Sequence, residues 1–240
     1  MHRFYMSCPL EPGKSYPLSK EEAHHASKVL RLRVGDEVEL LDGQCICSAK
    51  ITEIDRQEVS VLCLMKKPSV EPQTRITLYQ GFPKGDKLYY IVQKCTEIGV
   101  HAIVPIVMER CVKKNSNVDK VLEKCQKLSI EACKQCGRGH VPPVEDILSF
   151  AQSLKRMQRH DLLLVPWEEE TQQRLNAMIQ RAQKGMDIGI VIGPEGGISA
   201  AEMSALTALG AQSVTFGKRI LRTETAGMCA IFAILSGLND

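Results

Sequence analysis

The chain has 240 residues, of which 44% are hydrophobic and 25% charged, and its formal net charge is +3. This length and composition are typical of a folded globular protein with one large domain or two small ones. No apolar stretch approaches the roughly 20 residues that span a bilayer, and residues 1–5 lack the apolar run of a signal peptide. We therefore expect a cytoplasmic protein with no membrane partner.

Ten cysteines are present, and in a chain of this length without an export signal they favour free thiols over a disulfide framework. Cys133 and Cys136, with His140 beyond them, raise the alternative of a zinc site, because Cys-x-x-Cys can supply two corners of a tetrahedron. No second Cys-x-x-Cys completes such a site. We therefore expect no metal.

The first part of the chain has the pattern of short strands with one helix. Ser19 and Glu22 form a capping-box signature that predicts a helix running towards Leu30. Strands are predicted at 38–43, 46–54 and 59–65, the first ending in an Asp-Gly turn. The pattern predicts a small β-barrel domain over residues 1–70, followed by a linker at 66–72 that contains two prolines.

From residue 73 to residue 240, apolar runs alternate with helical stretches. The runs at 162–165 and 188–192 are apolar throughout, as expected for parallel strands that are covered on both faces. The fold class predicted for this part is α/β with a mainly parallel sheet. The further predicted strands are 76–82, 102–107 and 213–216, and the predicted helices are 87–98, 118–136, 199–209 and a terminal helix through Leu235.

Two glycine-bearing turns, 193–197 and 216–226, each follow a short apolar run and precede a helix. This order places them at the carboxyl end of the sheet, where open α/β proteins bind ligands. The first turn matches neither the dinucleotide fingerprint nor the P-loop. Its glycines could merely supply positive φ angles. A ligand site is favoured because the second turn adds three cations and a carboxylate: Lys218, Arg219, Arg222 and Glu224.

At these turns the sequence closely resembles the RsmE family of ribosomal RNA small-subunit methyltransferases. The resemblance rests on residues 192–199 with Glu202, and on residues 219–226. These motifs are highly specific. Other segments agree with the family, so that the resemblance covers nearly the whole chain: His24-His25, 29–36, 84–87, 93–100 and 134–138.

The resemblance implies a PUA-like β-barrel RNA-binding domain at 1–70 and a SPOUT methyltransferase domain at 73–240 with a C-terminal trefoil knot. It implies a homodimer that uses S-adenosylmethionine to methylate N3 of a uridine in 16S ribosomal RNA, a component of the small ribosomal subunit. In the family the cofactor lies among three strand-end loops, which correspond here to Leu164, Val165, Pro166, Ile192, Gly193, Pro194, Glu195, Gly196, Gly197, Phe216, Gly217, Ile220, Leu221, Thr225 and Ala226.

The acceptor atom of such a reaction carries a proton that must leave as the new bond forms. Glu195 or Glu224 could accept it, directly or through water, and Arg222 or Arg138 could stabilise negative charge on the uracil oxygens. Two alternatives stay open for these residues. Arg222 could form a structural ion pair with Glu224, and Glu195 could be a carboxylate that interacts with a helix N-terminus.

RNA contacts are expected on the barrel domain, although it is nearly neutral, with 10 Lys and Arg against 11 Asp and Glu in residues 1–72. Binding to RNA phosphates then requires that the cations Arg3, Lys28, Arg31 and Arg33 share one face. Two other functions are weighed. A non-enzymatic RNA-binding module predicts a damaged cofactor loop, and a nucleotide-binding oxidoreductase predicts a fingerprint in the first βα unit. Neither feature is found.

Overall fold

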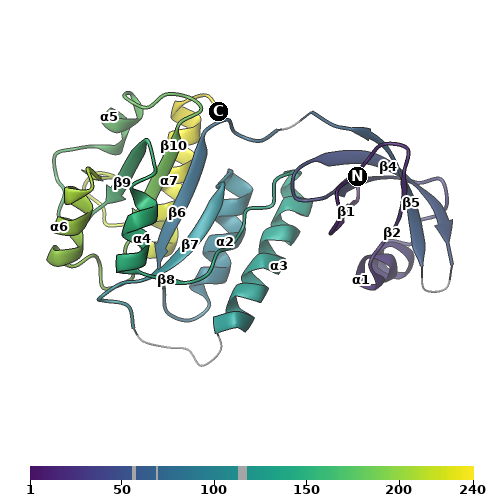
Figure 1. The fold of residues 1–240 in the computed structure, drawn as a ribbon, viewed down its shortest axis with the longest axis horizontal. Coiled ribbons are helices and arrows are strands. Elements are labelled where there is room, and N and C mark those ends of the chain that lie inside the picture. Colours follow the sequence, from purple (N-terminus) through teal and green to yellow (C-terminus); the bar gives the residue numbers. More distant parts are fainter. Residues whose placement is uncertain (56–57, 69, 113–117) are drawn as a thin grey trace. The chain divides into compact units, whose positions relative to one another are not determined.

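The computed structural model describes residues 1–55, 58–68, 70–112 and 118–240, and it divides into two compact units (Figure 1). The first unit comprises Met1–Glu71 and Ile130–Val141, and the second comprises Pro72–Ser129 and Pro142–Asp240. The sequence had assigned every residue from 73 onward to one domain, whereas the contacts group Ile130–Val141 with the first unit. Ser69, in the predicted linker, lies outside the described residues.

The first unit contains a mixed five-stranded sheet with the order β1-β3-β4-β5-β2. β1 is parallel to β3, and the remaining pairs are antiparallel. Its core alternates along the strands, as in β4, where Cys47, Ala49 and Ile51 are buried. The three predicted strands are present, whereas the three-residue β1 and β2 were not predicted. The bounds are β1 Arg3–Tyr5, β2 Ser15–Pro17, β3 Glu37–Leu41, β4 Ile46–Ile54 and β5 Val59–Lys66.

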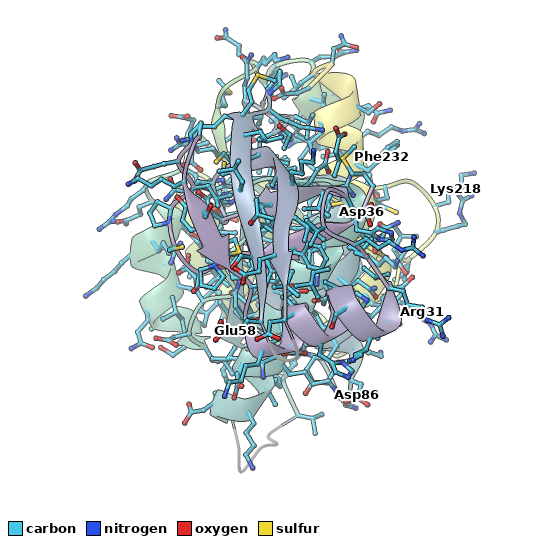
Figure 2. All side chains as sticks on the ribbon, turned by 90° about the vertical axis from the view of Figure 1, so that its right-hand side faces the viewer. Arg31, Asp36, Glu58, Asp86, Lys218 and Phe232 are labelled. Carbon is cyan, nitrogen blue, oxygen red and sulfur yellow. The ribbon has the colours of Figure 1, made fainter. Side chains whose placement is uncertain are left out.

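The predicted first helix begins as expected and then changes from α-helical to π-helical hydrogen bonding. Ser19 caps α1 (Lys20–His24) by accepting a hydrogen bond from the Glu22 N–H at 3.2 Å. The chain then continues as the π-helical turn η1 (His25–Val29). Arg31 follows in a left-handed conformation, with φ of 55°, and its side chain projects outward (Figure 2). Ordinary residues avoid this conformation, and glycine is usual at this position after a helix.

The second unit is built on a six-stranded sheet with the order β11-β9-β10-β6-β7-β8, and every pair of neighbouring strands is parallel. The mainly parallel sheet predicted from the sequence is therefore confirmed. The strand bounds are β6 Arg75–Gly81, β7 Ala102–Val107, β8 Leu148–Ser149, β9 Leu162–Pro166, β10 Asp187–Ile192 and β11 Gln212–Val214.

Helices cover both faces of this sheet, which explains why residues 162–165 of β9 and 188–192 of β10 are apolar throughout. In β10, Ile190 belongs to the hydrophobic cluster under α2, α5 and α7, and Val191 belongs to the cluster under α4 and α6. No described helix is long and apolar enough to cross a membrane. The bounds are α2 Lys87–Ile98, α3 Val118–Cys136, α4 Phe150–Met157, α5 Leu175–Ile179, α6 Ala200–Ala208 and α7 Thr223–Gly237.

Candidate active site

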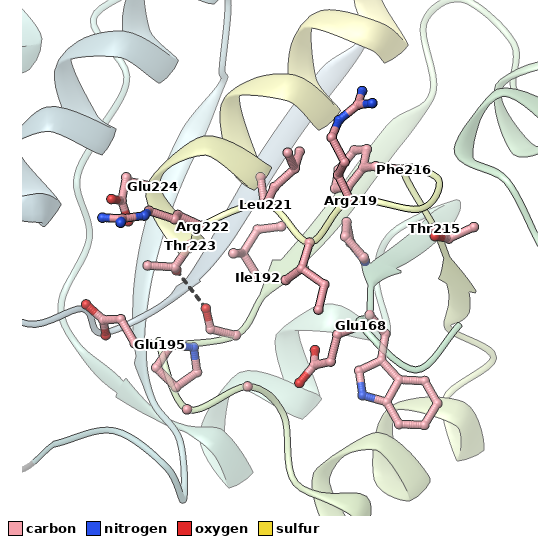
Figure 3. Close-up of a pocket in the computed structure, with 18 of the residues that line it drawn as sticks. Glu168, Ile192, Glu195, Thr215, Phe216, Arg219, Leu221, Arg222, Thr223 and Glu224 are labelled. Carbon is pink, nitrogen blue, oxygen red and sulfur yellow. Dashed lines mark hydrogen bonds between the residues drawn. The ribbon is translucent and has the colours of Figure 1, made fainter. Parts of the chain in front are cut away.

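A pocket of about 520 Å³ opens at the carboxyl ends of neighbouring strands of the parallel sheet (Figure 3). Its walls are the segments that follow β9, β10 and β11, together with the first turn of α7 and the first residue of α2. A volume of this size is within the range of pockets for small organic ligands. Both glycine-bearing turns identified in the sequence line it.

The first glycine turn lies very close to the end of β6. A Cβ atom on Gly81 would lie 2.5 Å from the backbone nitrogen of Pro194, so a side chain at Gly81 would push the turn out of place. Within the turn, the Gly197 N–H donates to the Pro194 carbonyl at 2.9 Å, and Gly197 has a φ of 76°. Glycine adopts that conformation without the strain that a side chain would add. The wall of the pocket is therefore rigid main chain.

A chain of hydrogen bonds joins the two glycine-bearing turns beneath the pocket. The Thr223 hydroxyl, in the first turn of α7, donates to the Gly193 carbonyl at 2.7 Å, drawn as the dashed line in Figure 3. The same hydroxyl accepts from the side-chain amide of Gln80 at 2.8 Å. Gln80 is fully buried on β6. One hydroxyl thus fixes β6, β10 and α7 relative to one another.

The pocket also contains a cluster of charged groups. The Lys87 ammonium lies 2.9 Å from Glu195 Oε1 and 3.3 Å from Glu224 Oε2. Glu195 also accepts from the backbone N–H of Lys84, at 3.1 and 3.3 Å to its two oxygens. The labelled side chains of Glu195, Arg222 and Glu224 lie towards the same side of the pocket in Figure 3.

Two members of this cluster, Glu195 and Lys87, favour each other's charged form. Burial acts to raise the pKa of Glu195, but the hydrogen bond from Lys87 and the backbone N–H donors outweigh it and leave the pKa lowered. The pKa of Lys87 is raised, chiefly by its hydrogen bond to Glu195. At neutral pH the pocket therefore contains a carboxylate and an ammonium in direct contact.

Comparison with known proteins identifies the family. A family model described as an RNA methyltransferase domain matches residues 70–235, and one described as an RNA methyltransferase PUA domain matches residues 18–62. A ribosomal RNA small subunit methyltransferase E of Bacillus subtilis (strain 168) is 34% identical, over 98% of this chain and 96% of that protein. The chain belongs to the ribosomal RNA small subunit methyltransferase E family.

Solved structures of relatives share the whole fold. A ribosomal RNA small subunit methyltransferase E from Neisseria gonorrhoeae, bound to S-adenosyl methionine, is 32% identical with a TM-score of 0.86, over 98% of this chain and 97% of that one. A putative methyltransferase from Legionella pneumophila, also in complex with that cofactor, is 28% identical with a TM-score of 0.87, over 98% and 96% of the two chains. The matched family models thus assign a PUA domain to the first part of the chain and an RNA methyltransferase domain to the second.

Most of the residues that the family resemblance selected for the cofactor lie in the pocket wall. These are Pro166, all of Ile192 to Gly197, Phe216, Gly217, Ile220, Leu221 and Ala226. Leu164 and Val165 are instead buried in the two hydrophobic clusters, because they lie within β9 rather than after it. Thr225 is not part of the lining; its N–H donates to the Arg222 carbonyl within α7.

Of the four proposed catalytic residues, Glu195, Arg222 and Glu224 line the pocket. Glu195 is not at the start of α6, which Ser199 caps, but meets the N–H of Lys84 just before α2. Arg138 belongs to the first unit, where its guanidinium donates to Glu71 at 2.7 and 2.9 Å.

The four predicted RNA-binding cations belong to the first unit and differ in their surroundings. Lys28, Arg31 and Arg33 are exposed. Arg3 instead donates to Glu39 at 2.6 Å and to the carbonyl of Lys134 at 2.8 Å, so its charge is neutralised within the unit.

Several lining residues were not selected from the sequence. Lys87 and Thr223 both stand inside motifs that carried the resemblance, but no motif states which side chain faces a pocket. Glu168 follows β9 by only two residues. Trp167 and Arg219 lie in loops that the sequence had already assigned to the site, so the remaining additions are Val214 and Thr215.

We expect Thr223→Val to destabilise the fold by about 1–3 kcal/mol, because it leaves one hydrogen of the buried Gln80 amide unpaired and removes the donor to the partly buried Gly193 carbonyl. Thr223→Ser keeps the hydroxyl and should lower the free energy of unfolding by less than Thr223→Val, although it deletes a methyl group. The free energies of unfolding of both variants are measured in urea. A loss in the serine variant equal to that in the valine variant would contradict the role given to the hydroxyl.

Proposed function

We propose that this protein transfers the methyl group of S-adenosylmethionine to N3 of a uridine in 16S ribosomal RNA. The observation that carries this proposal is the pocket, whose walls are the strand-end loops expected for the cofactor. Membership of the family and the cofactor-bound relatives support the same reading.

The residues of the pocket fit this cofactor. Ile192, Val214, Leu221 and Ala226 provide an apolar surface for a purine ring, and the glycine turn allows main-chain groups to approach it closely. Three carboxylates, Glu168, Glu195 and Glu224, also line the pocket and complement the cationic sulfonium. The pocket thus combines an apolar surface for the purine with anionic groups for the sulfonium.

When bound, the cofactor supplies an activated methyl group on a sulfonium, so the protein has mainly to align the acceptor and remove its proton. We assign to Glu195 or Glu224 the role of accepting the N3 proton, directly or through water. The lowered pKa of Glu195 supports this assignment in one respect, because an acceptor must be ionised before it takes a proton.

We assign to Arg222 the role of stabilising negative charge on the uracil oxygens. It is exposed, it lines the pocket, and it precedes α7 without making a side-chain cap. Arg138 stays a second candidate for this role. Since Arg138 is already paired with Glu71, it would have to share that ion pair to act on the substrate.

The first unit is proposed to hold the RNA through Lys28, Arg31 and Arg33. The left-handed backbone of Arg31 supports this, because strained conformations of this kind cost about 1–3 kcal/mol and tend to persist at functional positions. The π-helical turn just before it is another feature that is frequent at functional sites.

The remaining family features are part of the same proposal. A homodimer is supported by large apolar side chains that α2 and α7 leave exposed, Tyr90 at 48% and Phe232 at 63% (Figure 2). We also propose that the chain between β10 and α7 follows the knotted path of the SPOUT fold. The site of action is the cytoplasm, with the RNA present in the small ribosomal subunit.

The decisive test uses mass spectrometry of 16S ribosomal RNA from cells that lack the gene. We expect N3-methyluridine to disappear and to return when the purified protein and S-adenosylmethionine are added to the subunits. Calorimetry should give binding of S-adenosylmethionine and none of NAD. Persistence of N3-methyluridine in the deleted strain would exclude the proposed function.

Arg222→Ala should lower kcat by about 100-fold to 1000-fold, the usual effect of removing a group that stabilises developing charge. The affinity for S-adenosylmethionine, measured by calorimetry, should change far less than kcat. Arg181→Ala removes an exposed arginine of the same unit that does not line the pocket and serves as the control. An unchanged kcat in the Arg222 variant would remove Arg222 from the catalytic residues.

Arg31→Gly should separate RNA binding from folding. It removes one cation, so the slope of log affinity against log salt concentration should fall by about 0.7–0.9. The melting temperature should stay the same or rise, because glycine tolerates the left-handed backbone. Lys14→Ala, which removes an exposed lysine paired with Glu11, should leave the slope unchanged. An unaltered slope in the Arg31 variant would exclude a phosphate contact.

A further inference from the structure

One lysine links the two carboxylates that compete for the proton-accepting role. Lys87 is the first residue of α2, whereas Glu195 lies in the glycine turn after β10 and Glu224 in the first turn of α7. The lysine Nζ lies 2.9 Å from Glu195 and 3.3 Å from Glu224. Three elements that are distant in the sequence thus meet in one charged cluster, in which Lys87 alone had no role assigned from the sequence.

A tight turn just before α2 places Lys87 beside the two carboxylates. Gly85 adopts a φ of 61°, in the turn that leads into the helix. The same turn directs the N–H of Lys84 at Glu195. Glu195 is therefore held by two donors from one short segment, a backbone N–H and the Lys87 ammonium. The same ammonium lies 3.3 Å from Glu224 Oε2, a buried oxygen that accepts no hydrogen bond within the described structure.

The cluster is shielded from solvent but not sealed. The side-chain exposed fractions are 33% for Lys87, 23% for Glu195 and 17% for Glu224. Two carboxylates this close together repel each other, and repulsion alone would raise the pKa of one of them. The pKa of Glu195 is instead lowered, and the side chain that lowers it is Lys87, through its hydrogen bond and its charge. The ammonium therefore offsets both the repulsion and the burial.

Other charged groups of the lining must be included in this balance. Arg222 lies two residues before Glu224 in the sequence and is exposed, whereas Lys87 is half-buried. Burial is the main cause of the raised pKa of the Cys111 thiol, and the charge of Glu195 adds to it. The remaining charged residues of the lining are Glu168 and Arg219.

We propose that Lys87 is a positioning residue for methyl transfer, whose ammonium holds Glu195 and Glu224 in fixed orientation beside the acceptor base and keeps Glu195 ionised. This proposal rests on the function proposed above. It assigns Lys87 no contact with the uracil and no part in moving the proton. A carboxylate that is already protonated cannot accept the N3 proton, so loss of Lys87 would inactivate the enzyme first at low pH.

A purely structural tether predicts a different outcome. If Lys87 only fastened α2 to the two loops, its loss would lower the melting temperature and the cofactor affinity equally at every pH. The shape of the pH profile would then be unchanged. The pH dependence of kcat therefore separates the two roles.

The test compares Lys87→Gln with Lys94→Gln, each in the full-length protein. Lys94 lies on the same helix, pairs with Glu97 and does not line the pocket, so its replacement is a matched loss of one charge. We expect the acid limb of the kcat profile to move to higher pH in Lys87→Gln only, with activity recovering towards the wild-type value at high pH. Lys87→Arg should restore most of the wild-type profile because it keeps the cation.

A second measurement does not depend on turnover. The carboxyl carbon of Glu195 is followed by NMR in protein with labelled glutamate, and its signal is assigned by its loss in Glu195→Gln. We expect the midpoint of its titration to rise in Lys87→Gln and to stay unchanged in Lys94→Gln. An unchanged midpoint together with a superimposable kcat profile would overturn the proposal.

These measurements also distinguish this proposal from the one on which it rests. If the wild-type protein forms no N3-methyluridine, the proposed function fails. The titration of Glu195 still decides whether Lys87 controls the ionisation of the cluster. If the wild-type protein is active but the titration does not move, the role of Lys87 alone is wrong.

Discussion

The parallel order of the sheet is the constraint on which the site depends. Because β11, β9, β10 and β6 are neighbours and point the same way, the segments after them converge at one edge. Three of these segments form the walls of the pocket, and the segment after β6 leads to Lys87. No single loop could provide both the apolar surface and the charged cluster. The pocket is thus a consequence of strand order, refined by the close approach of Gly81 to Pro194.

A small number of polar contacts stabilise this edge of the sheet, and they fall into two groups with different effects. Thr223 and Gln80 are buried, and their hydrogen bonds fix the backbone positions of the walls. Lys87 and Glu195 are partly exposed, and their ion pair sets charge rather than stability, since ion pairs near the surface contribute little to folding. Rigidity and electrostatics are therefore supplied by different residues of the same pocket.

Much of this arrangement was predictable from the sequence, for physical reasons. Runs such as 188–192 are apolar because helices cover both faces of the sheet. The start of α6 was predictable because Ser199 and Glu202 form a capping box. The edge strands β1, β2 and β8 have too few residues for a period to emerge, whereas the three-residue β11 overlaps the strand predicted at 213–216. The role of Lys87 and the pairing of Arg138 with Glu71 were not predictable, because each joins residues far apart in the chain. The change from α-helix to π-helix at His25 was also not predictable, because it does not alter the hydrophobic pattern.

The distribution of charge around the pocket bears on how one site can serve both proposed ligands. A sulfonium cofactor is favoured by negative surroundings, whereas RNA is a polyanion that such surroundings repel. The lining supplies Glu168, Glu195 and Glu224, and the loop before α7 presents the exposed cations Lys218, Arg219 and Arg222. The ammonium of Lys87 reduces the net charge of the carboxylates without removing them. The pocket can therefore be anionic enough for the cofactor while its rim stays cationic for RNA, and Lys87 stands where these two requirements conflict.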